Sequence, residues 1–239
     1  MVKNIIKIIA IFIIGAIGGI FADQILWPYF IERPLFYKYR LEQNPVYVIE
    51  KKEVIIQENI ALIEAINKVK NSIVAIKTEP KKGKTIFGSG IIVTSDGLMV
   101  TLAELVPFGS NFNFYIANKK VHFQILKRGL KENLALIKIK TDENLSTCAF
   151  ADFEKIKLGK RVILIGTIFD NNEPKLMVNE GIIKYFDKNY IHTNIFEKNT
   201  LSGSSLFDIE GNLLGLNEID KEGKIISISI EKIKEFIGF

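Results

Sequence analysis

The hydrophobic pattern divides the chain into an apolar N-terminal stretch and a long region of short apolar runs. From Ile5 to Ala22 the sequence is almost entirely apolar, and only Lys7 interrupts it. A helix of about 18 residues spans about 27 Å, which is close to the thickness of the hydrocarbon core of a membrane. Lys3 and Lys7 precede the apolar residues and Asp23 follows them. The positive-inside rule therefore predicts a cytoplasmic N-terminus and an extracytoplasmic remainder.

A cleavable signal peptide is the alternative explanation for this stretch. A signal peptide has an apolar segment of about 7–15 residues and a small residue two positions before its cleavage site. Here the stretch is longer, and Ile20 stands two positions before Ala22. We therefore expect an uncleaved single-pass anchor in the cytoplasmic membrane over residues 1–30. The aromatic residues expected at the lipid–water interface are Trp27, Tyr29 and Phe30.

Two helices are expected outside the membrane segment. Residues 31–57 are expected to form a spacer, because Pro34 and Pro45 oppose a long continuous helix. From Glu58 to Lys70 apolar residues recur at helical spacing, which predicts an amphipathic helix. Its apolar positions are Ile60, Ile63, Ala65, Ile66 and Val69. A final short helix from Glu231 to Phe239 is predicted to pack on the strands through Ile233, Phe236 and Ile237.

Between these helices the pattern is typical of an all-β protein. About a dozen short apolar runs alternate with turns rich in glycine, aspartate and asparagine, which predicts a β-sandwich or a pair of β-barrels. Residues 95–97 and 221–223 each end in glycine and are expected to form hairpin turns. The expected strands lie at residues 72–76, 90–93, 98–101, 112–116, 121–126, 134–139, 162–166, 181–185, 190–193, 206–208, 213–216 and 225–230.

Charge and cysteine content exclude few classes of function. The formal net charge is +5, and the lysines are dispersed along the chain. This distribution predicts a solvated basic surface rather than a nucleic-acid-binding stripe. Cys148 is the only cysteine, so neither an intramolecular disulfide nor a cysteine-based metal site can form. His122 and His192 lie far apart in the sequence, and we expect no metal and no cofactor.

Three segments resemble trypsin-like serine proteases of the HtrA/Deg type and occur in the order of that family. Residues 88–101, GSGIIVTSDGLMVT, are similar to the strand–turn–strand that ends just before the catalytic histidine. Residues 132–139, ENLALIKI, are similar to the strand that carries the catalytic aspartate. Residues 199–217, NTLSGSSLFDIEGNLLGLN, are similar to the nucleophile loop and the hairpin after it, and residues 191–194 match the strand that enters this loop.

The resemblance covers about residues 58–239 and implies the fold of the family. That fold is a trypsin-like double β-barrel, in which two six-stranded antiparallel barrels flank the site. The expected organisation places the amphipathic helix and the first barrel at residues 58–150. The second barrel and the C-terminal helix then occupy residues 151–239.

In this register Ser202 occupies the position of the catalytic nucleophile. Glu104 stands at the position of the family's histidine, and Asn133 at that of its aspartate. A nucleophilic serine needs a base to take its proton and a third group to orient that base. A carboxylate with a reference pKa of about 4.3 is a poor base at neutral pH, and asparagine brings no negative charge. The resemblance therefore implies a protease fold without the protease's catalytic base.

The loop around the nucleophile position also departs from the family. The resemblance implies an oxyanion hole from backbone N–H groups of the nucleophile and of a glycine two residues earlier. Thr200 replaces that glycine, and Leu201 and Gly203 flank Ser202. A β-branched residue tolerates unusual backbone angles poorly, which argues against an intact hole. A structural reading stays open, in which Ser202 is a polar residue of a surface turn, Glu104 is a solvated carboxylate and Asn133 opens a strand.

These inferences predict a membrane-anchored, extracytoplasmic pseudoprotease. Its expected role is to bind an extended peptide or protein segment between the barrels as an added strand, or to serve as a scaffold. The alternative is an active HtrA-like serine endopeptidase that uses Ser202 with a non-histidine base such as Glu104. A purely structural anchor differs from the first prediction only in lacking a ligand. We expect no PDZ domain after the second barrel, while the oligomeric state and the role of Cys148 stay open.

Overall fold

A computed structural model describes residues 2–27, 58–141 and 143–239. The chain forms two compact units, Met1–Ile55 and Ile56–Phe239. In the first unit, helix α1 (Val2–Phe21) is formed by the apolar stretch and continues into a π-helical turn, η1 (Ala22–Leu26). By length and composition, the helical segment Lys3–Leu26 is able to cross a membrane, with a mean hydropathy of 2.6. The spacer and two of the expected interfacial aromatics, Tyr29 and Phe30, lie outside the described residues.

The first barrel of the second unit consists of six antiparallel strands. They close in the order β1-β2-β3-β6-β5-β4, because β1 pairs with both β2 and β4. A 3-10 turn, η3 (Ala103–Leu105), follows β3. The strands are β1 (Ile73–Glu79), β2 (Ile86–Ile92), β3 (Leu98–Leu102), β4 (Asn111–Ile116), β5 (Lys119–Gly129) and β6 (Leu134–Lys140).

The second barrel closes in the same way. Its sheet has the order β11-β8-β9-β10-β13-β12-β7, and an additional β11–β12 pairing closes six of these strands. Strand β7, which is only two residues long, lies parallel to β12 at the outside. The strands are β7 (Ala149–Phe150), β8 (Arg161–Asp170), β9 (Glu173–Phe186), β10 (Tyr190–Phe196), β11 (Ser205–Asp208), β12 (Asn212–Ile219) and β13 (Lys224–Ser229). Turns η4 (Phe153–Lys155) and η5 (Asn199–Leu201) precede β8 and β11.

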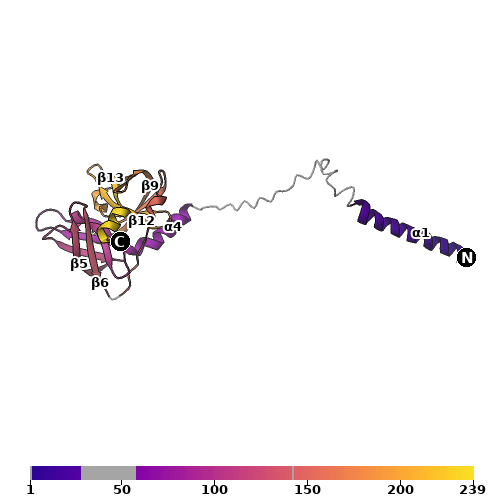
Figure 1. Ribbon diagram of the computed structural model, residues 1–239. Helices are drawn as coiled ribbons and strands as arrows, with labels where there is room; N and C mark the ends of the chain where they lie inside the picture. Colours follow the sequence, from indigo (N-terminus) through magenta and orange to yellow (C-terminus); the bar gives the residue numbers. More distant parts are fainter. Residues whose placement is uncertain (1, 28–57, 142) are drawn as a thin grey trace. The chain divides into compact units, whose positions relative to one another are not determined.

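This architecture confirms the pair of six-stranded antiparallel barrels. Figure 1 shows β5 and β6 in one group of strands and β9, β12 and β13 in the other. The sequence pattern missed β7 and the first half of β9, where Lys175, Asn179 and Glu180 interrupt the apolar run. β9 is paired with β8 and β10 and has a solvated face, so polar side chains are tolerated on it.

Helix α4 (Glu58–Val69) coincides with the predicted helix and packs through three of its five predicted apolar positions, together with Leu62. Ala65 and Val69 are buried, and Leu62 and Ile66 pack against the core cluster that the two barrels share. The prediction that Ile60 and Ile63 also belong to the packed face is wrong, because they are 47% and 56% exposed. The 3-10 turn η2 (Lys70–Ser72) then leads into β1.

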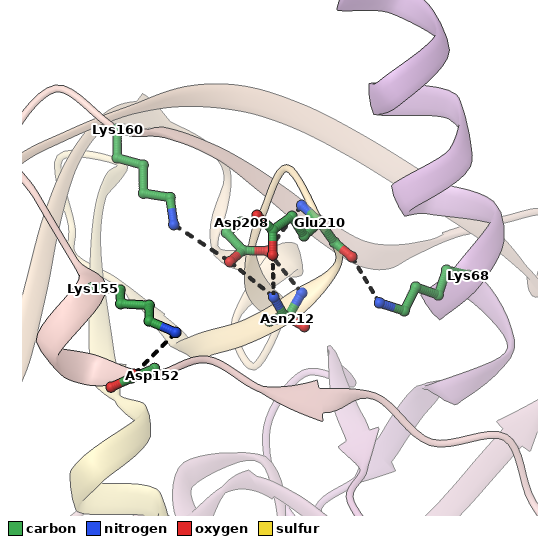
Figure 2. Close-up of polar contacts among 7 residues, drawn as sticks. All are labelled: Lys68, Asp152, Lys155, Lys160, Asp208, Glu210 and Asn212. Carbon is green, nitrogen blue, oxygen red and sulfur yellow. Dashed lines mark hydrogen bonds and ion pairs between the residues drawn. The ribbon is translucent and has the colours of Figure 1, made fainter.

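A polar turn in the second barrel holds the end of α4. Figure 2 shows Lys160 and Asn212 directed at the carboxylate of Asp208, and Lys68 of α4 directed at Glu210. The Asp208 side chain accepts bonds from the backbone N–H groups of Glu210 (3.0 Å) and Asn212 (2.9 Å), and Lys160 lies 3.5 Å away. Lys68 donates to the Glu210 carbonyl at 2.8 Å. A buried carboxylate that accepts several hydrogen bonds has its polar atoms satisfied. This cluster therefore has a structural role, because it stabilises the β11–β12 turn and holds it against helix α4.

Helix α5 (Ile230–Ile237) ends the described chain and matches the predicted C-terminal helix. The Ser229 side chain accepts a bond from the Lys232 N–H at its N-terminus, and Gly238 at φ +86° ends it in a left-handed conformation. Ile233 is fully buried and Phe236 is 7% exposed, so the helix packs onto the barrels through the expected residues.

Candidate active site

The loop that carries Ser202 is buried against both barrels. Turn η5 is closed by a 3.0 Å bond from the Leu201 N–H to the Lys198 carbonyl. The Leu201 side chain is 1% exposed and belongs to the core of the second barrel, whereas Thr200 is exposed. Ser202 itself is 5% exposed, so the alternative reading as a polar residue of a surface turn is wrong.

Two glycines let the loop approach the first barrel at close range. Ser89 on β2 donates its N–H to the Ser202 carbonyl at 3.0 Å. Gly203 has φ +75°, and a Cβ atom on it would lie 2.2 Å from the Ser89 carbonyl oxygen. A Cβ atom on Gly88 would lie 2.7 Å from the Ser202 carbonyl oxygen. Only glycine fits such a left-handed, close-packed position, so Gly203 fixes the loop against β2.

A second link ties the same loop to strand β12. The Gly203 N–H donates to the Asn217 carbonyl, and the Asn217 N–H donates to the Ser204 carbonyl, both at 2.8 Å. The Asn217 side-chain N–H also donates to the Ser204 hydroxyl at 3.0 Å. The side-chain oxygen of Asn217 accepts a hydrogen bond from the Ser227 hydroxyl. Ser202 is therefore held in a preorganised position between the barrels.

Glu104 lies on turn η3, between the buried residues Ala103 and Leu105. Its backbone N–H donates to the side-chain oxygen of Asn133 at 3.1 Å. Partial burial is the first cause that raises the pKa of the Glu104 carboxyl above its ordinary value, and the charge of Glu218 is the second. Hydrogen bonding with the side chains of Ser202 and Asn133 opposes this rise. The Glu104 residue is exposed overall, so solvent moderates all of these effects.

Asn133 connects the groups on the two sides of the site. It has φ +52° in the turn before β6, a conformation that asparagine adopts more readily than most residues. Its backbone carbonyl accepts a bond from the Ala103 N–H at 3.0 Å, next to the bond that its side chain accepts from Glu104. Its side-chain amide donates to a carboxylate oxygen of Glu218 at 2.7 Å.

The structure thus brings Glu104, Asn133 and Ser202 together and adds Glu218, which sequence reasoning missed. Glu218 is half-buried on β12, directly after the buried Asn217. Among the described residues, neither Glu104 nor Glu218 takes part in an ion pair. The only sequence signal was an acidic residue near the end of a strand, because the contact itself depends on how the barrels meet.

Neither histidine takes part in the described contacts that link Glu104, Asn133 and Glu218. The groups that act on the Glu104 carboxyl are Glu218, Ser202 and Asn133, and neither histidine is among them in the described part of the chain. His192 on β10 stacks on Tyr185 at 3.9 Å between ring centroids. Its pKa is lowered, first by burial and then by the charge of Lys224. Residues 2–27, 58–141 and 143–239 also contain no group of three or more side chains that could hold a metal ion.

Chemically, the site offers the hydroxyl of Ser202, whose backbone is held between the barrels, and the Glu104 carboxyl, whose pKa is raised. A hydroxyl donor and a neighbouring carboxylate can bind a polar group of a ligand. The roles of Thr200, Leu201 and Gly203 in an oxyanion hole stay predictions.

Known proteins with similar sequences are serine proteases. The family model described as "Trypsin-like peptidase domain" matches residues 88–216, which include Glu104, Asn133 and Ser202. A probable periplasmic serine endoprotease, DegP-like, of Rickettsia conorii is 29% identical over 143 residues, covering 55% of this chain and 28% of the relative. A probable serine protease do-like of Buchnera aphidicola is 26% identical over 152 residues, covering 59% of this chain and 31% of the relative. Serine protease HTRA1 of Xenopus laevis is 27% identical over 165 residues, covering 63% of this chain and 35% of the relative.

The chain spans about a third of the length of each of these relatives. The matched region contains the strands and the loop that meet around Ser202, and both closed barrels have the predicted antiparallel form. On the family match and this architecture, the chain belongs to the trypsin-like peptidase domain family and is a homologue of HtrA/DegP-like serine proteases.

Proposed function

We propose that this protein is a membrane-anchored, extracytoplasmic pseudoprotease that binds extended peptide segments. The observation that carries the proposal is that turn η3, whose Leu105 side chain would lie 2.8 Å from a Cβ atom on Gly203, brings the carboxyl-bearing Glu104 rather than a histidine to the Ser202 loop. A general base must accept the hydroxyl proton near neutral pH and be oriented by a third group. Glu104 is a weaker base than imidazole, and Asn133 is engaged with Glu218 instead of orienting a base.

The backbone of β12 supports peptide binding beside Ser202. Strand β11 stops pairing with β12 at Leu216, whereas β13 continues alongside as far as Ile219. The N–H and carbonyl of Asn217 face the Ser202 loop, so those of Ile219, two residues further, face the same side. No described strand continues along that side of Ile219. An extended peptide can therefore add there through main-chain hydrogen bonds, next to Glu218 and Ser202.

The membrane part of the proposal rests on the N-terminal helix. Its 24 residues from Lys3 to Leu26 would be about 36 Å long, which is enough to cross the hydrocarbon core with some tilt. Lys3 and Lys7 lie at its N-terminal end, and Asp23 lies near its other end. The charge distribution favours a cytoplasmic N-terminus and an extracytoplasmic barrel unit. The Rickettsia relative is a probable periplasmic protein, which agrees with that orientation.

An active endopeptidase is the second candidate function, and one observation favours it. The Ser202 side chain acts on the pKa of the Glu104 carboxyl and lowers it, while burial and the charge of Glu218 raise it. A higher pKa makes the carboxylate a stronger base, although it acts as a base only at a pH above that pKa. This candidate keeps Ser202 as nucleophile and Glu104 as base, and it predicts activity that rises as Glu104 ionises.

Peptide binding can be tested at the free edge of β12. Fluorescein-labelled β-casein serves as an unfolded probe, and its anisotropy is measured with the full chain in neutral detergent. Ile219→Pro removes the N–H that faces the peptide, and Ile219→Ala is the matched control that shortens the side chain but keeps this donor. We expect the proline variant to bind casein at least about tenfold more weakly than the alanine variant. Equal binding by both variants, or none by the wild type, contradicts the proposal.

A further inference from the structure

A polar hollow whose lining includes no residue of the Ser202 loop lies between helix α5 and the turn that joins β5 to β6. Its volume is about 540 Å³, which falls in the range of small-molecule sites. Lys127, Lys131 and Lys232 contribute three ammonium groups to its lining, and Asn189 and Tyr190 contribute an amide and a phenol. Two carboxylates, those of Glu132 and Glu235, also line it. The lining therefore carries an excess of one positive charge.

Two of the three ammonium groups are held in place by aromatic rings. The Lys127 ammonium lies 4.2 Å from the Phe236 ring centroid and donates to the Phe236 carbonyl at 3.0 Å. The Lys232 ammonium lies 4.6 Å from the Tyr190 ring centroid and donates to the Tyr190 hydroxyl at 3.2 Å. Contacts with a ring face attract a cation and restrict the long side chain that carries it. The two positive charges are therefore positioned before any ligand binds.

The ammonium groups keep unused hydrogen-bonding capacity. Each has three N–H donors, and those of Lys127 and Lys232 each make one described hydrogen bond to the protein. Lys131 is exposed and makes no described hydrogen bond. No described ion pair involves any of these three lysines, so the two lining carboxylates do not neutralise them by direct contact, and Asp187 acts on Lys232 only at longer range.

We propose that this hollow binds a ligand that carries a phosphate group. Lysine binds phosphate as a point charge, and several ammonium groups can share the three oxygens that one phosphate offers. A planar carboxylate offers two oxygens and fits three separate donors less well. The hollow is larger than a phosphate, so the rest of the ligand would lie along the rings of Tyr190 and Phe236. The ligand would also lie beside Lys131 and Glu132, which directly precede Asn133 in the chain.

The test measures binding of inorganic phosphate to the full chain in neutral detergent, by calorimetry at constant ionic strength. The variant Lys127→Gln/Lys232→Gln removes the two positioned charges. Lys155→Gln/Lys157→Gln is the matched control, because it removes two lysine charges outside the hollow. We expect saturable binding by the wild type and the control, and affinity at least about tenfold lower in the first variant. Absence of saturable wild-type binding, or an equal loss in both variants, overturns the proposal.

A single substitution distinguishes a loss of phosphate binding from a folding defect. Lys127 also bonds the backbone of α5, so its loss can disturb the helix. Lys131→Gln removes a charge from the hollow without removing a described contact of the fold, and it is expected to weaken phosphate binding about threefold or more. Unchanged affinity in Lys131→Gln together with native-like affinity in the double variant overturns the proposal.

Competition identifies the source of the phosphate group. Glycerol 3-phosphate represents soluble phosphorylated compounds, and phosphatidic acid in phosphatidylcholine vesicles represents a lipid headgroup with a terminal phosphate. Vesicles of phosphatidylcholine alone are the control for the lipid arm. Displacement of bound phosphate by either of the first two probes supports the site and assigns its source. Displacement by neither contradicts a phosphate-bearing ligand. The outcome does not depend on whether Ser202 is catalytic, so it is independent of the function proposed above.

Discussion

The side-chain amide of Asn133 donates a 2.7 Å hydrogen bond to a carboxylate oxygen of Glu218, and this bond joins the two barrels beside Ser202. The other side-chain atom of Asn133, its carbonyl oxygen, accepts from the Glu104 N–H. Only a side chain with one acceptor and one donor can make both bonds at once. An aspartate would accept from Glu104 but would meet Glu218 with a second negative charge. Asparagine at the position of the family's aspartate is therefore suited to Glu218 rather than to an imidazole.

The first prediction concerns Asn133→Asp. It replaces the donor to Glu218 with a carboxylate, so repulsion should destabilise the fold by about 2 kcal/mol at neutral pH. The loss should shrink as the pH falls below about 5, because the crowded carboxyls then take up protons. Chemical denaturation of the full chain at neutral pH and at a pH below about 5 measures the loss of unfolding free energy. Asn118→Asp is the matched control, since Asn118 is exposed and has a similar φ of +66°. Equal effects of the two substitutions would contradict the role of Glu218.

The second prediction is a pair of opposite shifts in the pKa of Glu104. Glu218→Gln removes a like charge and should lower that pKa, whereas Ser202→Ala removes a hydrogen bond and should raise it. Carboxyl ¹³C chemical shifts followed by NMR during a pH titration report both changes. Glu222→Gln, in the turn between β12 and β13, should leave the titration unchanged. If Glu218→Gln and Ser202→Ala shift the pKa of Glu104 in the same direction, the placement of Glu218 and Ser202 beside Glu104 is refuted.

The same pKa has a consequence for stability. The folded chain holds the Glu104 proton more tightly than the unfolded chain, since the pKa is raised above its ordinary value. Stability is therefore lost as the pH rises from that value through the raised pKa. Glu104→Gln should remove this part of the pH dependence. The change should be less than about 1 kcal/mol because the residue is exposed.

The third prediction tests the close packing of the nucleophile loop. Gly203→Ala combines a left-handed backbone with a Cβ atom only 2.2 Å from the Ser89 carbonyl oxygen. We expect a loss of at least about 3 kcal/mol in unfolding free energy. Gly159→Ala is the matched control, because Gly159 has the same φ of +75° and open space around it. That variant should lose only about 1–2 kcal/mol, which is the backbone strain alone. The difference between them measures the contact between β2 and the loop.

How far the sequence could predict this molecule differs between the fold and the site. The barrels follow from local alternation of apolar and polar residues and from glycine turns such as Gly97 (φ +97°), which are properties of neighbouring residues. The solvated half of β9 lacks that alternation, and the face of α4 that packs depends on the surface it meets. Ile60 and Ile63 have the right spacing but extend beyond that surface.

The site shows the same limit. The positions of Glu104, Asn133 and Ser202 could be read from motifs that are local in sequence. Glu218 could not, because its bond to Asn133 joins residues 85 positions apart in the chain and depends on the packing of one barrel on the other. The burial of Ser202 also depends on β2, which approaches the loop only through glycine. Long-range packing, rather than local pattern, decides both features.

The fourth prediction concerns topology. If Lys3 and Lys7 hold the N-terminus in the cytoplasm, protease added to intact spheroplasts should digest the barrel unit without lysis. A cytoplasmic marker protein should stay intact in the same sample. Protection of the barrels until the membrane is dissolved would reverse the orientation. N-terminal sequencing is the companion measurement, and a mature chain that begins near Ala22 would identify a cleaved signal peptide instead of an anchor.

The last prediction is catalytic silence at Ser202. Loss of one member of a catalytic triad typically lowers the rate by several orders of magnitude, and the remaining acceleration depends on the oxyanion hole and on substrate binding. Here Glu104 and Asn133 stand at both partner positions, and Asn133 is bonded to Glu218. Hydrolysis of casein and of peptide esters should not exceed that of Ser202→Ala at any pH from about 5 to 9. Restoring the family's pair with Glu104→His/Asn133→Asp should not create activity, because the new aspartate would lie against the Glu218 carboxylate. Adding Glu218→Gln to that pair removes the repulsion and is the variant in which some turnover is expected first. Robust wild-type turnover that Ser202→Ala abolishes would instead establish the active endopeptidase, with Glu104→Gln as the next variant to assay.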